Sequence, residues 1–498
     1  MACVTDDCGH CKKEAIKSRT IGFVRSGVHP LHVLAYKEIL KKKGHTVFSV
    51  CEDLKEKAQY DKDIKVYCLE GWLKKHWDKF NMKRLRALSR KYDAYNLWEV
   101  YYTDRYMRYK YSHEDAVKLI CGMITFWEYL LKDSGADYVA SDCIIGANLF
   151  VGMIVGEKQG VRFIFNQDAR YKQYHAFFTL HEGYENPVFY KYLDEENSVS
   201  EQELSNTREY ISNYINNRMH PEYIYSSVNA SKNIKNVIAD YAPRLWRINH
   251  FFDKKYKNKF NPHEYKNEWA FLGAAKEAAR QAFVQKYFDE PDQKEDYFLF
   301  PLHFQPEAST CVYARKYENQ AYFVEQLAKS IPVDKTLYVK EHSVRKGHKP
   351  ISFYRELSRY PNVKIISWDA DTHQLIKRAS AVICLTSTVG FESLMYGKPV
   401  FMCGDTYFNH FSGVTVIHDV FDEKEKFRNP PVQDRELYIR QMACYLKSIQ
   451  FCTFQEDPIH EETPQRLYEM QRDSINELMR FIEELENGVI PDKTKWGR

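Results

Sequence analysis

The sequence predicts an α/β protein with two Rossmann-like units that face each other across a cleft, followed by a C-terminal helical segment. Three observations lead to this fold class. The chain opens as a strand, a helix and a strand; short apolar runs alternate with helical stretches again from residue 297; and after about residue 430 only helical patterns remain. Strands joined by such crossover helices run parallel, and their connections are right-handed.

The first unit is expected to cover residues 19–290. Its strands alternate with helices, the first of which ends at Gly44. Residues 186–290 are rich in Tyr, Asn and Lys and show few strand signals, so we interpret them as a helical insertion and a linker. The predicted strands are 21–26, 45–51, 136–142 and 161–168, and the predicted helices between them are 33–44 and 148–160.

The second unit is expected to cover residues 291–430, and residues 431–498 are expected to form helices that cross back to the first unit. Apolar runs of strand type alternate with helical stretches in the second unit, which is typical of a doubly wound parallel sheet. The predicted strands are 297–304, 336–342, 363–368, 381–387 and 399–404, and the predicted helices are 321–330, 352–360, 372–380 and 390–397.

The composition excludes several classes of protein. The 498 residues are 44% apolar and 28% charged with a net charge of +4, which is ordinary for a globular protein and gives no general nucleic-acid signal. No run approaches the roughly 18 apolar residues that cross a bilayer, and the N-terminus has no apolar signal core. We therefore expect a cytoplasmic protein, with peripheral contact at the inner membrane face as an open alternative.

Residues 1–18 form a separate segment that contains Cys3, Cys8, His10 and Cys11. Soft ligands at such short spacing could gather a zinc ion. Zinc modules usually carry a second ligand pair that closes a loop, and the sequence shows none. We therefore expect a flexible tail without a metal ion.

A phosphate site is predicted directly after the apolar run 381–385. Thr386, Ser387 and Thr388 follow this run where a helix should begin. The free N–H groups of a first helical turn, with hydroxyl side chains beside them, suit an anionic group such as a nucleotide phosphate. The alternative interpretation is simple N-capping by Ser387. An earlier strand ends in Lys340 and His342, which supports the first interpretation.

Three segments resemble the signature blocks of the capsule and surface polysaccharide biosynthesis proteins, a GT-B glycosyltransferase group that includes bacterial β-Kdo transferases. They are PLHFQPEAST (301–310), YVKEHS (338–343) and TSTVGFESLMYGKPV (386–400). The resemblance covers roughly residues 295–410. It implies a GT-B fold and a nucleotide phosphate held by the Lys-x-His turn and the Ser/Thr-rich helix start. Ser343 stands where the family usually has proline, which leaves the donor open.

The candidate binding residues lie where predicted strands end, because ligands of open parallel sheets bind beyond the carboxyl ends of the strands. Glu392 is placed to accept hydrogen bonds from ribose hydroxyls, although it could be an ordinary helix-start carboxylate. His342 could likewise be a surface loop histidine. The donor-binding candidates are Lys340, His342, Ser387, Thr388, Gly390, Glu392 and Gln305, and the acceptor-side candidates are Arg25, His29 and Arg170.

For catalysis, a glycosyl transfer needs a base for the acceptor hydroxyl or a nucleophile on the sugar, and a carboxylate can serve as either. Asp168 lies at the end of the predicted strand 161–168, after its apolar run VRFIF, and its segment NQDAR loosely resembles the family segment that carries an essential aspartate. Glu307 is the reserve candidate. No clustered carboxylates indicate a metal site, and N-capping explains the single DxD-like triplet at 369–371, so no metal or cofactor is expected.

Residues 71–92 carry eight Lys and Arg residues against Asp78 alone, with Trp72, Trp77 and Phe80 among them. A basic helix with tryptophans can lie on an anionic membrane surface. The alternative is a solvated helix face that packs on the protein through its apolar residues.

These observations favour a metal-independent GT-B glycosyltransferase. We expect it to move a sugar from a nucleotide-activated donor, such as a CMP-linked acidic sugar like Kdo, to a surface polysaccharide or glycolipid acceptor. Three alternatives remain open: a sugar-nucleotide 2-epimerase, a transferase of CDP-linked polyol phosphates, and a non-catalytic glycan-assembly protein.

Overall fold

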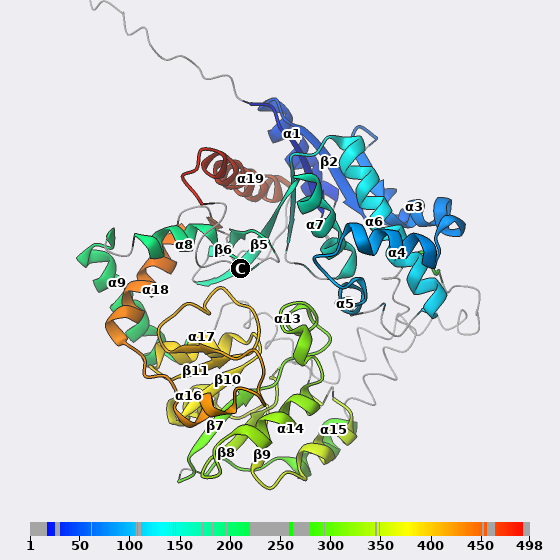
Figure 1. The fold of residues 1–498 in the computed structure, drawn as a ribbon. Helices are drawn as coiled ribbons and strands as arrows, with labels where there is room; N and C mark the ends of the chain where they lie inside the picture. Colours follow the sequence, from blue (N-terminus) through cyan, green and yellow to red (C-terminus); the bar gives the residue numbers. More distant parts are fainter. Residues whose placement is uncertain are drawn as a thin grey trace, which may run out of the picture.

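The structure is a computed structural model with two sheets, each covered by helices on both faces (Figure 1). The predicted α/β class with two Rossmann-like units is confirmed. The structure describes residues 17–24, 30–60, 62–105, 107, 111–142, 144, 146–171, 174–181, 184–195, 198–219, 258–261, 279–292, 294–343, 346–347, 349–450, 453–455 and 464–491. The expected tail with Cys3, Cys8, His10 and Cys11 lies outside these residues.

The first sheet has the strand order β13-β6-β5-β4-β1-β2-β3. Five neighbouring strands, from β5 to β3, run parallel, whereas β6 pairs antiparallel with β5 and β13 pairs antiparallel with β6. The strands are β1 (Thr20–Val24), β2 (Thr46–Cys51), β3 (Lys65–Cys68), β4 (Tyr138–Asp142), β5 (Arg162–Tyr171), β6 (Tyr174–Thr179) and β13 (Thr453–Gln455).

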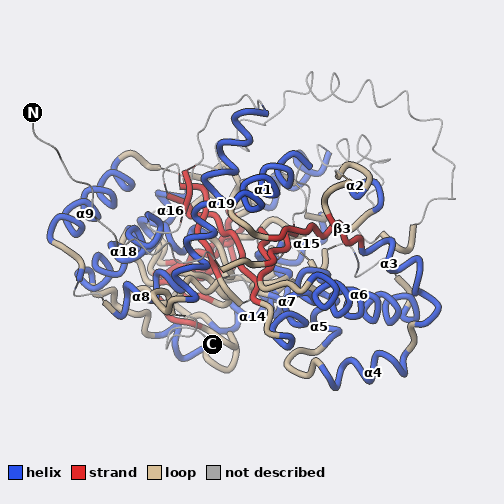
Figure 2. Tube along the Cα trace, turned by 90° about the horizontal axis from the view of Figure 1, so that it is seen from above, coloured by secondary structure: helices blue, strands red, loops and turns tan. Residues whose placement is uncertain are grey.

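Helices close both faces of the first sheet. One face packs on α1 (Pro30–Lys42) and α19 (Pro464–Glu486), which lie side by side in both views (Figures 1 and 2). The other face packs on the segment between β3 and β5. That segment contains α3 (Leu69–His76), α4 (Met82–Lys91), α5 (Leu97–Tyr102), α6 (His113–Ser134) and α7 (Ala147–Gln159).

Local sequence signals set the ends of α6, the longest of these helices. The Ser112 hydroxyl accepts a hydrogen bond from the Asp115 backbone N–H, which satisfies one of the free donors of the first turn. Gly135 ends the helix with φ 63°, a left-handed conformation that glycine adopts at little steric cost. Between these signals the helix is apolar on most of its surface and lies buried under the sheet.

The second sheet is entirely parallel, with the order β12-β11-β10-β7-β8-β9. Successive residues of β7 pack in the apolar cores on opposite faces of the sheet. Tyr297 and Leu299 pack on one face, and Phe298 and Phe300 pack on the other. This explains the continuous apolar runs in the sequence. The strands are β7 (Tyr297–Pro301), β8 (Thr336–Lys340), β9 (Val363–Ile366), β10 (Ala381–Cys384), β11 (Val400–Met402) and β12 (Val414–Val416).

Helices from both sides of the linker cover the second sheet. One face packs on α14 (Gln320–Ser330) and α15 (Ile351–Leu357). The other face packs on helices that include two from before the linker, which the sequence analysis grouped with the first unit. These helices are α8 (Pro187–Asp194), α9 (Glu201–Asn216), α16 (Thr372–Arg378), α17 (Thr388–Met395) and α18 (Arg435–Gln450).

The expectation of helix alone after residue 430 is wrong. Residues between α18 and α19 contribute β13, which extends the first sheet beyond β6. The expectation that β5 ends near residue 168 is also wrong, because β5 continues to Tyr171 as an antiparallel ladder with β6. The first difference arises because β13 is short and pairs with a distant segment, and the second arises because β6 follows β5 directly and extends its pairing.

The basic segment 71–92 packs on the protein, as the second interpretation held. Trp77 is 3% exposed in the apolar core, and Trp72 stacks on Tyr129 with ring centroids 4.8 Å apart. The indole N–H of Trp72 donates to the Thr125 hydroxyl at 3.2 Å. Trp72 thus packs on α6 through its ring and its N–H group while it stays partly exposed. In the part of the chain that the structure describes, no helix has the length and apolar character needed to cross a bilayer.

Candidate functional site

The second sheet contains a topological switch point between β7 and β10. The chain adds β8 and β9 on one side of β7, and β10, β11 and β12 on the other side. In open α/β sheets, ligands bind in the crevice outside the carboxyl ends of the two strands where the order reverses. The segments that enter this crevice are the 302–307 turn after β7 and the 385–388 turn between β10 and α17.

The turn between β10 and α17 presents a helix N-terminus to the crevice. Ser387 is the N-cap of α17, and its hydroxyl accepts a hydrogen bond from the Val389 N–H at 3.2 Å. The Thr386 hydroxyl donates to the Ser309 carbonyl at 3.0 Å, which ties the turn to the segment after β7. Ser387 therefore caps the helix, as one interpretation held, while its own O–H can still donate to a ligand oxygen.

His303 fixes this turn from the other strand. Its Nε2 accepts a hydrogen bond from the Thr386 backbone N–H at 3.3 Å. Burial, together with the nearby charges of His342 and Lys349, lowers the pKa of His303 to about 3. The ring is therefore neutral at physiological pH, which an acceptor nitrogen requires. His303 couples the two turns at the switch point.

The backbone of His303 is held by two side chains from distant parts of the second unit. Gln320, at the start of α14, accepts from the His303 N–H at 2.7 Å and donates to its carbonyl at 3.0 Å. The Lys349 ammonium group donates to the same carbonyl at 2.9 Å. All three residues are buried. His303 is among the residues that the sequence places at the end of a predicted strand, whereas Gln320 and Lys349 were not selected, because a glutamine 17 residues away in the sequence gives no signal without the fold.

The Lys-x-His turn lies at the end of β8, the neighbour of β7. The Lys340 ammonium group donates to the carbonyls of Glu341 and Trp368, at 3.1 and 3.2 Å, and burial lowers its pKa to about 8. Lys340 thus stabilises the turn that follows β8 through these two hydrogen bonds. His342 is half-buried, and its charge contributes to the lowered pKa of His303, so its ring lies near the switch point.

Glu341, between these two residues, organises the turn. One carboxylate oxygen accepts the His342 backbone N–H at 2.8 Å, and the other accepts the Tyr354 hydroxyl at 2.6 Å. Tyr354 belongs to α15 and is fully buried. The turn therefore has a defined conformation, because both oxygens of a buried carboxylate are satisfied by groups from the fold.

Glu392 and Gly390 lie on the inner side of α17. Glu392 is 4% exposed, and burial raises its pKa to about 7, although the hydroxyls of Tyr214 and Thr388 partly oppose this shift. Tyr214 comes from α9, so Glu392 is covered by that helix here. A Cβ atom at Gly390 would lie 3.2–3.3 Å from Phe408, Cys384 and Met402, which indicates that glycine allows α17 to pack tightly on the sheet.

The remaining candidates of the second unit lie in the 302–307 turn. The Gln305 side-chain amide donates to the Glu318 carbonyl and so holds the segment that follows α13 (Ala308–Cys311). Glu307 is exposed at the N-cap position of α13, and its carboxylate accepts the Ser309 hydroxyl at 3.3 Å. Glu307 therefore faces solvent at the edge of the crevice.

The candidates of the first unit are described only in part. Asp168 lies within β5, paired with Ala176 of β6, and its side chain and that of Arg170 are outside the described atoms. Arg25 and His29 are outside the described residues altogether. The neighbouring Gln167 donates its side-chain amide to the Tyr313 hydroxyl at 3.2 Å. Because Tyr313 follows β7, this contact shows that the carboxyl end of β5 faces the second unit.

The DxD-like triplet does not form a metal site. Asp371 is the N-cap of α16 and accepts from the Gln374 N–H at 3.2 Å, which confirms the capping interpretation. Asp369 pairs with Lys346 instead. Within the described ranges, no group of three or more His, Cys, Asp or Glu side chains is arranged to hold a metal ion.

Comparison with solved structures gave several matches with low sequence identity. One is the β-Kdo 2,7-transferase of KpsC from Thermosulfurimonas dismutans, at 11% identity and a TM-score of 0.30, over 64% of this chain and 79% of that chain. Another is the UDP-GlcNAc 2-epimerase from Neisseria meningitidis bound to UDP-GlcNAc, at 13% identity and a TM-score of 0.23, over 93% of this chain and 100% of that chain. A third is HepE from Anabaena in complex with UDP and glucose, at 12% identity and a TM-score of 0.25, over 94% and 100% of the two chains.

Comparison with curated proteins gave no match. The sequence model of one protein family, described as "Capsule polysaccharide biosynthesis protein", matches residues 236–453. The matched range includes β7 to β12 and thus both turns of the switch point. This match confirms the resemblance to capsule polysaccharide biosynthesis proteins that the sequence predicted, over residues 236–453 of this chain.

Proposed function

We propose that this protein is a glycosyltransferase that binds a nucleotide-activated sugar at the switch point of the second sheet. The observation that carries the proposal is the hydrogen bond from the Thr386 N–H to the buried, neutral His303. It fixes a helix N-terminus at the position where open α/β sheets bind ligands. The match of residues 236–453 to a capsule polysaccharide biosynthesis family supports a role in glycan assembly.

In this proposal, the donor phosphate lies against the first turn of α17. The free N–H groups of that turn and the Ser387 hydroxyl supply hydrogen bonds, the Thr388 hydroxyl supplies one when it turns from Glu392 to the phosphate, and His342 supplies a charge-assisted one. A helix N-terminus alone contributes about 0.3–1 kcal/mol to anion binding, so side-chain donors are needed as well. The scheme uses no metal ion or cofactor. The donor we favour is a CMP-linked acidic sugar such as Kdo.

For the chemical step, we propose Asp168 as the general base or nucleophile and Glu307 as the reserve candidate. Asp168 belongs to β5, the strand whose Gln167 contacts Tyr313 of the second unit. This contact brings the backbone next to Asp168 close to the second unit, which supports the choice of Asp168. The acceptor in this proposal is a surface polysaccharide or a glycolipid, with Arg25, His29 and Arg170 on the acceptor side.

Isothermal titration calorimetry with CMP, CDP, UDP and GDP tests the proposal. One nucleotide should bind the full chain, and EDTA should not change its affinity. His342→Ala should weaken binding by about 1.5–3 kcal/mol, the scale of a charged hydrogen bond, whereas His181→Ala on the first unit should not. Asp168→Asn should bind the nucleotide normally and lose turnover by about 100-fold or more. Absence of binding to every nucleotide would contradict the proposal.

A further inference from the structure

A cavity of about 500 Å³ lies between the two units, beside the switch point. Its first wall is the end of α5 in the first unit, with Glu99 and Tyr102. Its other walls are the 313–318 segment, which includes the short helix η7 (Arg315–Tyr317), and the residues that follow β11 and β12. Ligand sites typically have volumes of about 300–1,000 Å³. None of the residues that sequence analysis selected lines this cavity.

The cavity shares a wall with the turn between β10 and α17. Gly404 lines the cavity, and a Cβ atom at this position would lie 2.5 Å from the Leu385 carbonyl and 2.8 Å from the Thr386 side chain. Such distances leave no room for any side chain, so the backbone of residue 404 lies directly on the turn. A molecule in the cavity is therefore a neighbour of a group bound at the helix N-terminus.

The chemistry of the walls favours a ligand without charge. Both cations of the lining are engaged: Arg315 pairs with Glu99, and Lys316 donates to Asp419 at 2.9 Å and to the His418 carbonyl at 2.7 Å. An anion would also meet a wall with more carboxylates than cations. The charged side chains of the lining are Arg315, Lys316, Glu99, Glu318 and Asp405.

The same walls suit a molecule that has hydroxyl groups and an apolar face. Carboxylates accept hydrogen bonds from hydroxyls, and an aromatic ring offers a flat apolar surface against which the C–H face of a sugar ring can pack. Tyr102 is the most exposed aromatic residue here, at 52% of its surface, and Tyr313 and Tyr317 also line the cavity. Neutral sugars have both properties.

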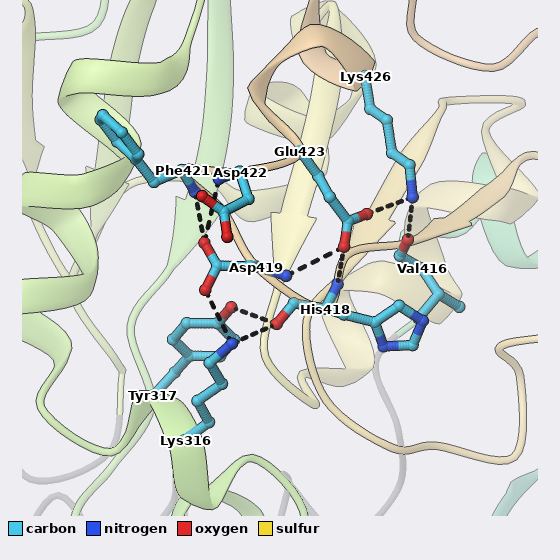
Figure 3. Close-up of polar contacts among 9 residues, drawn as sticks. All are labelled: Lys316, Tyr317, Val416, His418, Asp419, Phe421, Asp422, Glu423 and Lys426. Atoms are coloured by element: carbon cyan, nitrogen blue, oxygen red, sulfur yellow. Dashed lines mark hydrogen bonds and ion pairs between the residues drawn. The ribbon is translucent and has the colours of Figure 1, made fainter.

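One wall is preorganised by a network around His418 (Figure 3). The His418 carbonyl accepts from Lys316 and from the Tyr317 hydroxyl, at 2.7 and 2.9 Å, and its N–H donates to Glu423 at 3.0 Å. Asp419 accepts the N–H groups of Phe421 and Asp422. The backbone is thus fixed, while the exposed His418 imidazole stays outside this network. A fixed wall lowers the entropic cost of binding.

We propose that this cavity binds a neutral sugar residue or short neutral oligosaccharide of the acceptor, packed on Tyr102 and hydrogen-bonded by the carboxylates and His418. The inference rests on the proposed transfer reaction, because it places the acceptor next to the donor phosphate. It also narrows the acceptor class, since the part of the glycan beside the reaction centre has no carboxylate or phosphate group.

Saturation-transfer NMR with the full chain tests the inference. The probes are maltose, cellobiose and lactose as neutral disaccharides, and glucuronic acid as an anionic sugar. At least one disaccharide should receive saturation on its C–H protons, and glucuronic acid should receive less. Tyr102→Ala should weaken binding of that disaccharide at least tenfold, and Tyr102→Phe should retain it. Tyr322→Ala is the matched control, because Tyr322 is 55% exposed on α14, away from the cavity.

The results separate this inference from the proposed function. Binding of a nucleotide in calorimetry without binding of any neutral disaccharide would overturn the cavity inference alone. Equal disaccharide affinity in wild type and Tyr102→Ala, or a preference for glucuronic acid, would overturn it too. Failure of every nucleotide to bind would remove the proposed function, whatever the disaccharides do.

Discussion

Glu486 connects the last residue of α19 to the first strand of the chain. Its two carboxylate oxygens accept hydrogen bonds from Arg19, at 3.1 Å from Nε and 3.0 Å from Nη2. The Tyr138 hydroxyl of β4 donates to the same carboxylate at 2.9 Å. Only 6% of the Arg19 side chain and 19% of the Glu486 side chain are exposed. We predict that Glu486→Gln loosens the attachment of α19 to the first sheet.

The expected magnitude follows from the pKa of this carboxyl group. The hydrogen bonds from Arg19, more than any other cause, lower the pKa of Glu486 from 4.5 to about 2. This difference corresponds to about 3 kcal/mol of stability, which partial exposure to solvent reduces to about 1–2 kcal/mol. Because the pKa is lower in the folded protein, the contribution is complete above about pH 4.5 and is lost as the pH falls towards 2.

Urea unfolding, followed by tryptophan fluorescence, measures this contribution. At pH 7, Glu486→Gln should lower the free energy of unfolding by about 1–2 kcal/mol, and the difference from wild type should shrink as the pH falls from 5 to 3. Glu483→Gln is the matched control, because Glu483 is an exposed carboxylate on the same helix. A loss no larger than that of the control, or a loss that is the same at every pH, would refute the reasoning.

Two further predictions concern the switch point. His303→Leu should lower the free energy of unfolding by about 1–3 kcal/mol, because it leaves the Thr386 N–H without its acceptor. His303→Asn can keep an acceptor, so it should lower the free energy of unfolding by less. Equal losses of stability and of nucleotide affinity in the two variants would contradict this role of His303. Burial raises the pKa of Glu392 from 4.5 to about 7, so the folded protein binds this proton more tightly than the unfolded chain and loses stability as the pH rises from about 4.5 to 7. In urea unfolding, the free energy of unfolding of Glu392→Gln minus that of wild type should therefore increase by about 1–3 kcal/mol as the pH rises from 5 to 8. A difference that does not change with pH would show that Glu392 is not buried as described.

The strands of the second sheet could be predicted because helices bury both of their faces, so that Tyr297 to Phe300 and Ala381 to Cys384 form continuous apolar runs. The strands β6 and β13 could not. β13 is the edge strand; it pairs antiparallel with β6 across a sequence distance of more than 250 residues, and it has only three residues, too few for a recognisable pattern.

The candidate site was predictable only at the level of segments. The turn at Ser387 was located correctly, since hydroxyl residues after an apolar run mark a helix start. The environment of each side chain was not predictable: Lys340 donates to the Trp368 carbonyl, and Tyr214 of α9 covers Glu392. These contacts join elements that are distant in the sequence, and local patterns carry no information on such pairs.

The position of β13 and α19 has a consequence for the order in which the two sheets can form during synthesis. The ribosome makes residues 453–455 and 464–486 after every strand of the second sheet. Until then, β6 is an unprotected edge and α1 lacks its neighbour, whereas the second sheet has all its strands once Val416 has left the exit tunnel. Domains of multidomain chains usually fold in their order of synthesis. Here the unit that begins first is completed last, and its apolar surface needs protection, by a chaperone or by the second unit, for most of translation.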